Sequence, residues 1–160
     1  MNKQKKDAGI EWTHVPGYGG YTSNPIQGCT HKCEWIMPDK THAICYAKRI
    51  AESVAKSAYP NGFESLQFNP DELDAIRRAK KPAAIFIDSM SDLVGEGVPT
   101  EWIEAVIETM RDCPQHIFQI LTKNAPRLLQ FEWPSNAWVG ISSPPDFMFG
   151  KRLYPDQQTR

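Results

Sequence analysis

Apolar and polar residues recur along this chain in two rhythms, one typical of helices and one of strands. After Tyr46, apolar residues return about every 3.6 positions, which predicts a helix that stops at the turn 59–62. Its apolar positions are Ala47, Ile50, Ala51, Val54 and Ala58. A cap followed by proline at Asn69-Pro70 predicts a second helix that runs to about Lys80. Before Cys29, the glycine-rich segment 16–21 is expected to be a loop, followed by an extended stretch around 21–27.

Beyond residue 82, short apolar runs alternate with helical patterns. The runs 84–87, 117–121 and 137–141 are predicted to be strands. A helical pattern from Trp102 to Met110 separates the first two strands, and Asn124 is placed to cap a short helix carrying Leu128 and Leu129. Alternating strands and helices predict right-handed βαβ units, so the expected fold class is α/β with a parallel sheet. The tryptophans Trp35, Trp102, Trp133 and Trp138 are expected to serve packing rather than binding.

Polar side chains follow each of these three strands. Asp88, Ser89, Ser91 and Asp92 follow the first strand, Thr122-Lys123 end the second, and Ser142-Ser143 follow the third. Residues at the carboxyl ends of parallel strands usually build the functional site. Carboxylates and hydroxyls suit the polar groups of a ligand, and a lysine suits a carboxylate or a phosphate. The alternative is that the serines and aspartates only cap the following turn and that Lys123 is solvated.

Three of the four cysteines crowd into residues 29–45. Three residues separate Cys29 from Cys33, whereas eleven residues separate Cys33 from Cys45. The segments 34–37 and 41–44 are strand-like arms around a turn at Pro38-Asp39-Lys40. In a hairpin centred on Asp39, residues whose numbers sum to 78 face each other, which places Cys33 opposite Cys45. Directly opposed β-carbons lie about 4.5–5.5 Å apart, so both thiolates could serve one metal centre.

Three interpretations of these cysteines remain open from the spacing. Three thiolates could hold a [4Fe–4S] cluster and leave one iron free for another ligand. Cys29, Cys33 and Cys45 with His31 or His42 could instead form a tetrahedral zinc site. They could also be small buried residues without chemistry. Cys113, at a helix end before Pro114, is expected to be structural.

Composition narrows the class of protein. The chain has 160 residues, 41% of them hydrophobic, and a net charge of −1, which predicts a folded domain and no overall electrostatic footprint for nucleic acid. Residues 1–60 carry 8 basic and 5 acidic side chains, a weak local excess of positive charge. No apolar run is long enough for a membrane span or a signal peptide, so a cytoplasmic protein without membrane contact is expected. Neither a nucleotide-binding glycine loop nor a hydrolase nucleophile arrangement stands out.

Six segments carry a resemblance to a known family and occur in the same order as in it: Ile10-Glu11-Trp12-Thr13, 24–33, Cys45-Tyr46-Ala47-Lys48, 88–93, Leu121-Thr122-Lys123 and 138–142. From about Ile10 to Lys151, the chain resembles a family of phage and prophage proteins that carry a three-cysteine motif and are related to the radical S-adenosylmethionine superfamily. The superfamily usually has three residues and then two between its cysteines, with an aromatic residue before the third. In this chain the second gap is eleven, and the aromatic Tyr46 follows Cys45.

The resemblance implies a cofactor set and a reaction type. Cys29, Cys33 and Cys45 would bind a [4Fe–4S] cluster whose open iron takes S-adenosylmethionine, and an electron donor would reduce it. Reductive cleavage would then release a 5′-deoxyadenosyl radical that abstracts a hydrogen from an unknown substrate, for which nucleic acid is one candidate. Residues expected near S-adenosylmethionine or the substrate are Tyr46, Asp88, Ser89, Ser91, Asp92, Lys123 and Ser142. The competing function is a zinc-stabilised binding module without catalysis, and a third is a degenerate member that retains only the fold.

The same resemblance sets expectations about domain organisation. Residues 1–160 are expected to form one radical-SAM-like domain, part of a partial TIM barrel with a cysteine-bearing hairpin, and residues 1–20 a flexible segment. Family members continue past residue 160, so a C-terminally truncated form is expected. The open sheet edge after Ile141 would then be covered by a partner chain or by missing sequence. A phage-encoded chain would act in the bacterial host cell.

Overall fold

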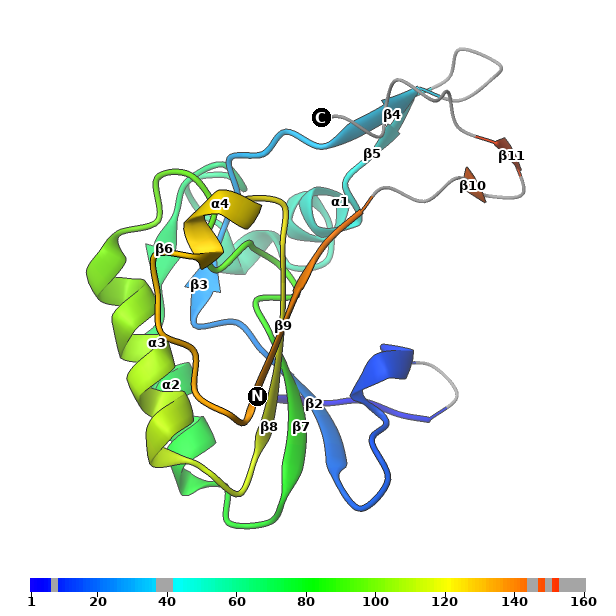
Figure 1. The fold of residues 1–160 in the computed structure, drawn as a ribbon. Helices are drawn as coiled ribbons and strands as arrows, with labels where there is room; N and C mark the ends of the chain where they lie inside the picture. Colours follow the sequence, from blue (N-terminus) through cyan, green and yellow to red (C-terminus); the bar gives the residue numbers. More distant parts are fainter. Residues whose placement is uncertain (7–8, 37–41, 144–146, 149–150, 153–160) are drawn as a thin grey trace.

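A computed structural model describes residues 1–6, 9–36, 42–143, 147–148 and 151–152 of the chain (Figure 1). Its strands are β1 (Asn2–Lys3), β2 (Gly19–Ser23), β3 (Ile26–Gln27), β4 (Glu34–Ile36), β5 (His42–Ile44), β6 (Gln67–Phe68), β7 (Ala83–Ile87), β8 (Ile117–Thr122), β9 (Ala137–Ile141), β10 (Phe147–Met148) and β11 (Lys151–Arg152). Its α-helices are α1 (Tyr46–Glu52), α2 (Pro70–Arg78), α3 (Thr100–Asp112) and α4 (Ala125–Leu128). Two 3₁₀ helices, η1 (Glu11–Thr13) and η2 (Lys56–Ala58), complete the described elements.

The central sheet has the strand order β1-β2-β7-β8-β9. Strands β2, β7, β8 and β9 are parallel, and β1 pairs antiparallel with β2 at one edge. The mixed α/β class and the mostly parallel sheet predicted from the sequence are therefore confirmed. Because all parallel strands point the same way, the loops that follow them gather at one end of the sheet (Figure 1).

Helices α2 and α3 cover one face of this sheet (Figure 1). Strand residues two apart point to the same face, so Ile85 and Ile87 of β7 face the helices together. The helices meet them with apolar residues at helical spacing. This core contains Leu73, Ile76, Ile103, Val106, Ile107, Met110, Phe118 and Ile120. Burying each such side chain contributes about 1.5–3 kcal/mol. Cys113 is 2% exposed and belongs to this core, which confirms its structural interpretation.

The opposite face of the sheet is partly covered by η1. Phe86 and Gln119 are register partners on β7 and β8. The ring of Trp12 packs edge-on against Phe86 with 5.5 Å between ring centroids, and the Gln119 side-chain amide donates a 2.6 Å hydrogen bond to the Trp12 carbonyl oxygen. Gly20 allows this approach, because a β-carbon there would lie 2.8 Å from the Thr13 hydroxyl oxygen. The loop predicted over 16–21 is wrong from Gly19 onward, because strand β2 begins at that residue.

The helix predicted from Tyr46 to the turn at 59–62 is shorter than its pattern suggested. Helix α1 ends at Glu52, and a separate 3₁₀ helix follows. Val54 is 88% exposed, so the apolar spacing continues beyond the point where a core is available to receive it. Helix α2 and the other predicted strands and helices occur where expected.

Two further sequence predictions are corrected. Asn124 precedes α4 but makes no capping bond, because its side-chain amide donates to the Val94 carbonyl oxygen at 3.1 Å. Leu129, which was expected on this short helix, follows its last residue and is 90% exposed. Trp138 is 51% exposed on the edge strand β9, in contrast to Trp102, which stacks on Phe68.

The N-terminal segment contacts the sheet at two points. β1 pairs with β2, and Thr13 of η1 is fully buried. Among the described residues, no helix combines the length and the apolar character that crossing a membrane requires.

Candidate functional site

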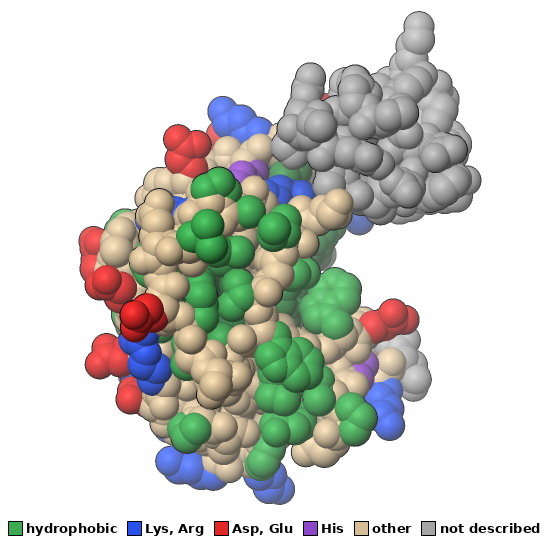
Figure 2. Space-filling view, viewed as in Figure 1, with side chains coloured by type: hydrophobic (Ala, Val, Ile, Leu, Met, Phe, Trp, Pro, Cys, Tyr) green, Lys and Arg blue, Asp and Glu red, His purple; other side chains and the backbone are tan. Residues whose placement is uncertain are grey.

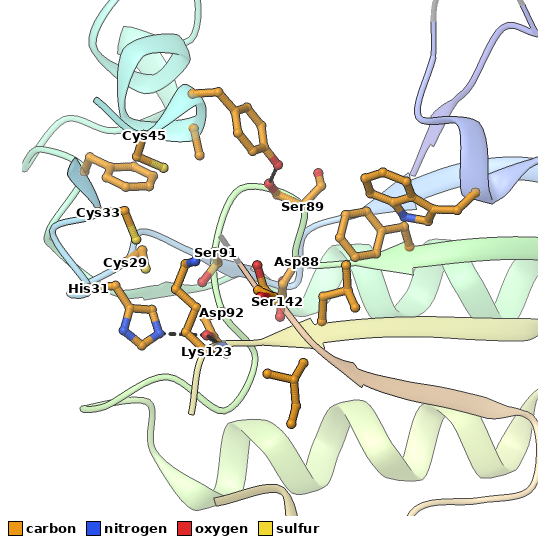
Figure 3. Close-up of a pocket in the computed structure, with 18 residues that line it drawn as sticks. Cys29, His31, Cys33, Cys45, Asp88, Ser89, Ser91, Asp92, Lys123 and Ser142 are labelled. Atoms are coloured by element: carbon orange, nitrogen blue, oxygen red, sulfur yellow. Dashed lines mark hydrogen bonds and ion pairs between the residues drawn. The ribbon is translucent and has the colours of Figure 1, made fainter. Parts of the chain in front are cut away.

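A pocket of about 720 Å³ opens where the loops after β7, β8 and β9 meet the cysteine-bearing segment (Figure 3). All ten residues proposed from the sequence as metal or cofactor ligands line it: Cys29, Cys33, Cys45, Tyr46, Asp88, Ser89, Ser91, Asp92, Lys123 and Ser142. The three polar segments predicted to meet at the carboxyl ends of the strands therefore do so. The three cysteine side chains lie together at one end of the pocket, with Ser91, Asp88 and Ser142 farther along it (Figure 3).

The cysteine hairpin has the predicted register. β4 pairs antiparallel with β5, and Glu34 faces Ile44, so the residue numbers of each pair sum to 78. One step before these strands, the Cys45 backbone N–H donates a 3.1 Å hydrogen bond to the Cys33 carbonyl oxygen. Cys33 and Cys45 thus lie opposite each other at the base of the hairpin. The turn predicted at Pro38-Asp39-Lys40 lies outside the described residues.

Cys29 is held by the backbone around it. Gly28 has a φ of +87°, and the Cys29 N–H donates to the Phe63 carbonyl oxygen at 2.9 Å. Burial is the main cause that raises the pKa of the Cys29 thiol to about 11; the carboxylate of Asp92 and the other two thiols act in the same direction, and a hydrogen bond from the His31 backbone opposes them. Burial also raises the pKa of Cys33, an effect that the ammonium of Lys123 opposes. Because metals bind thiolates, binding here would release protons.

All four cysteines are free thiols. As placed among the described residues, no group of three or more His, Cys, Asp and Glu side chains forms a site that could hold a metal ion. The donor types nevertheless fit a cluster, because three soft sulfur ligands open onto one pocket and the charge of Lys123 favours the thiolate at Cys33.

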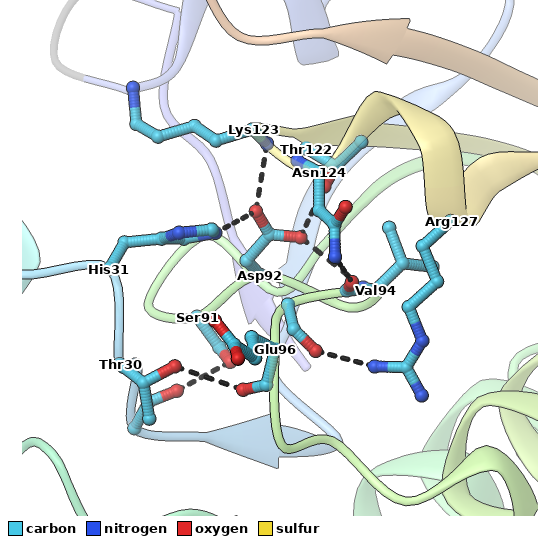
Figure 4. A network of polar contacts seen from close by, with 12 residues as sticks. Thr30, His31, Ser91, Asp92, Val94, Glu96, Thr122, Lys123, Asn124 and Arg127 are labelled. Carbon is cyan, nitrogen blue, oxygen red and sulfur yellow. Dashed lines mark hydrogen bonds and ion pairs between the residues drawn. The ribbon is translucent and has the colours of Figure 1, made fainter. Parts of the chain in front are cut away.

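Asp92 is the centre of a polar network that joins the cysteine loop to β8 (Figure 4). Its Oδ2 accepts hydrogen bonds from His31 Nε2 at 2.7 Å and from the Lys123 N–H at 2.8 Å. Its Oδ1 accepts from the Thr122 hydroxyl at 2.6 Å and from the Val94 N–H at 3.2 Å. Asp92 therefore acts as a positioning residue for the pocket wall, with both of its oxygens engaged.

The same network determines the charge of Asp92. Burial alone would raise the pKa of this carboxyl, but the hydrogen bonds from His31, from Thr122 and from the backbone hold it below the usual range. The pKa of Asp92 is thus lowered, and the side chain is a carboxylate at neutral pH.

The surroundings of Asp88 shift its pKa in the opposite direction to that of Asp92. It is 3% exposed, and its backbone has a φ of +56°. Its Oδ1 accepts the Ile26 N–H at 3.0 Å, whereas its Oδ2 has no hydrogen-bond partner among the described residues. Burial raises the pKa of Asp88 well above its usual range, and the charges of Asp92 and Glu72 raise it further. Asp88 is therefore a carboxyl group that favours its protonated form.

The loop after β7 is tied to both neighbouring segments. The Tyr46 hydroxyl donates to the Ser89 carbonyl oxygen, and the Ser89 hydroxyl donates to Asn24 Oδ1 at 3.1 Å. The Ser91 hydroxyl donates to the Gly28 carbonyl oxygen at 2.7 Å. These bonds fix the polar loop against the segment that carries the cysteines.

The pocket also contains residues to which the sequence analysis gave no role there. Trp12, Phe86, Leu121 and Ile141 form its apolar part. His31, one of the two histidines considered as a zinc ligand, lines the pocket as well. A signal for two of them was present in the sequence. Phe86 lies two positions before Asp88, and Leu121 lies two before Lys123, so each is close to the carboxyl end of its strand, where the site was expected.

The chain matches one family model, described as a protein of unknown function (DUF5131), over residues 7–151. No curated protein and no solved structure matches it.

Proposed function

We propose that this chain, which belongs to the DUF5131 family, is an iron–sulfur protein that binds S-adenosylmethionine and cleaves it reductively to start radical chemistry. One observation carries the proposal: three free cysteines and the polar carboxyl ends of three parallel strands open onto the same pocket. A cluster-binding enzyme needs both parts, thiolates for the irons and polar groups for a ligand beside them.

On this proposal, Cys29, Cys33 and Cys45 hold a [4Fe–4S] cluster and leave one iron free of protein ligands. The reduced cluster supplies the electron that cleaves the sulfonium bond of S-adenosylmethionine. The hairpin base holds Cys33 and Cys45 opposite each other through their backbone hydrogen bond. Lys123 favours the thiolate at Cys33 and adds a positive charge for the carboxylate of the ligand.

The loop after β7 and the end of β9 supply the remaining polar groups. Ser89 and Ser142 line the pocket with hydroxyl groups that suit ribose hydroxyls and an amine. Tyr46 begins α1 directly after Cys45, and its ring forms part of the pocket wall. Asp92 holds His31 and the Lys123 backbone in place rather than contacting the ligand.

The strand order supports a partial TIM barrel as the finer fold. Strands β2, β7, β8 and β9 follow each other across the sheet in chain order, without the reversal that marks a doubly wound sheet. In a barrel of this kind the edge of β9 is where the next strand is added.

The test is anaerobic reconstitution of the full chain with iron and sulfide, followed by metal analysis and by an assay of S-adenosylmethionine cleavage with a strong reductant. We expect about four iron and four sulfide ions per chain and release of 5′-deoxyadenosine. Cys45→Ala should lose the cluster, whereas Cys113→Ala, which changes a core cysteine outside the pocket, should retain it. An intact cluster in Cys45→Ala, or no cleavage by the reconstituted parent, would contradict the proposal.

A zinc-stabilised binding module is the second candidate, and one contact favours it. His31 lies in the pocket with the three cysteines and donates through Nε2 to Asp92. A carboxylate bonded to one imidazole nitrogen is the usual support of a histidine that binds zinc through the other. One tightly held zinc per chain, lost in both His31→Ala and Cys45→Ala and accompanied by no cleavage, would favour this candidate.

A further inference from the structure

The apolar part of the pocket is a fixed aromatic wall. Trp12 is 53% exposed, although its ring packs against Phe86 and its carbonyl oxygen accepts the 2.6 Å hydrogen bond from Gln119. The position of this tryptophan is therefore set by contacts on one side, while much of its surface remains open. Leu121 and Ile141, which are 37% and 62% exposed, extend the wall. Figure 2 shows apolar side chains gathered in the middle of this view of the molecule and most of the charged ones around its outline.

A hydrogen-bonding group without a partner lies beside this wall. Asp88 and Phe86 are two positions apart along the chain and both line the pocket. Oδ2 of Asp88 is buried and unpartnered among the described residues, and a protonated carboxyl offers an O–H donor at such a position. An unpaired buried polar atom is unfavourable, which favours a ligand that supplies an acceptor.

These features select a planar ring with an acceptor in its plane. The exposed indole favours stacking of a flat ring, and a donor beside it favours a ring nitrogen or a ring carbonyl. Nucleobases combine both properties, whereas a phenyl ring offers no acceptor in its plane.

We propose that the wall formed by Trp12 and Phe86 binds the nucleobase of the substrate, with Asp88 donating a hydrogen bond to the base. This inference rests on the proposed function, because it names the class of substrate that the same pocket takes. The substrate of the chain is thus a nucleoside unit, free or within a larger molecule, and it is distinct from S-adenosylmethionine.

The test measures binding of adenosine, guanosine, cytidine and uridine to the metal-free full chain by equilibrium dialysis, with ribose as the comparator. At least one nucleoside should bind, and ribose should not. Trp12→Ala should weaken binding about tenfold or more, whereas Trp12→Phe should retain most of it. Trp138→Ala is the matched control, because Trp138 is 51% exposed but lies outside the pocket, and it should bind like the parent.

Two substitutions at Asp88 test the hydrogen bond itself. Asn and Gly both tolerate the φ of +56° at this position, so neither adds backbone strain. Asp88→Asn keeps a donor and should retain nucleoside binding, whereas Asp88→Gly removes it and should weaken binding. Circular dichroism establishes that both variants are folded. Equal binding by Asp88→Gly and the parent would overturn the role of this residue.

Three outcomes would overturn the inference: no nucleoside binds, Trp12→Ala binds like the parent, or S-adenosylmethionine displaces the nucleoside competitively. The last would assign the wall to the cofactor, since a substrate must be bound together with it. Iron content after reconstitution of the same preparations tests the cluster separately. Nucleoside binding without a cluster would contradict only the proposed function, and a cluster without nucleoside binding would contradict only this inference.

Discussion

Replacing Asp88 by Asn should stabilise the protein near neutral pH, and the gain should grow as the pH rises. The amide keeps an oxygen for the 3.0 Å hydrogen bond from the Ile26 N–H and fits the same backbone conformation. It also removes the need to keep a buried carboxyl protonated. The comparison of the two proteins therefore isolates the titration of one group.

The sign of the effect follows from the raised pKa of Asp88. In the unfolded chain this carboxyl ionises near pH 4, whereas burial disfavours its charged form in the folded protein. The contribution of Asp88 is thus fully present below about pH 4 and is lost as the pH rises towards its folded-state pKa. The loss amounts to about 1.4 kcal/mol for each pH unit in that window.

Urea unfolding followed by far-UV circular dichroism measures the free energy of unfolding at steps from about pH 4 to pH 8. We expect the two proteins to agree at the acid end and to diverge by about 1.4 kcal/mol per pH unit until Asp88 ionises in the folded state. Asp92→Asn is the matched control: because the pKa of Asp92 is lowered, its contribution to stability is lost only as the pH falls below about 4, so the difference between the parent and Asp92→Asn should stay nearly constant over most of this pH range. Parallel curves for the parent and Asp88→Asn would refute the reasoning.

Two substitutions away from the titrating groups test the framework of the site. Gly28→Ala should lower the free energy of unfolding by more than Gly62→Ala does. Both glycines have a positive φ, but only at Gly28 would the new β-carbon clash with a backbone oxygen, that of Ser65. Equal costs for the two variants in urea unfolding would show that this contact is easily relieved. Arg127→Met should cost about 2 kcal/mol in the same assay, because the guanidinium donates hydrogen bonds of 2.5 and 2.6 Å to two carbonyl oxygens within the loop 95–98. An unchanged unfolding midpoint would mean that water replaces both bonds without loss.

The parts of the fold that could be predicted from sequence are those in which local pattern and tertiary environment agree. The buried run that became β7 and the helical spacing that became α3 have one arrangement that hides their apolar residues. The hairpin register was also predictable, because it depends only on where the turn is centred. The same argument brought Cys33 opposite Cys45 although eleven residues separate them.

The errors occur where tertiary contacts override the local pattern. The composition around Gly19 and Gly20 predicts a loop, but both residues lie in β2, and position 20 requires glycine because η1 approaches too closely for a side chain. Val54 continues the spacing of α1 but meets no core, so the helix ends before it. The role of Trp12 could not be predicted, because nothing local indicates that a residue of the N-terminal segment reaches β7 and β8. Asp88 could be predicted as a polar site residue, whereas the lack of a partner for its Oδ2 among the described residues depends on the folded surroundings alone.

Because Cys33 and Cys45 face each other at the base of the hairpin, the number of residues between them can change without moving them apart in space. The bond from the Cys45 N–H to the Cys33 oxygen closes the ladder at its base, while any change of length occurs at the far end. Adding or removing one residue in each arm leaves the base pair intact, whereas an unmatched change in one arm shifts every pairing and reverses the faces. Related chains can therefore vary this gap in steps of two. A search pattern that demands a constant number of residues between these cysteines will miss relatives that retain the same arrangement in space.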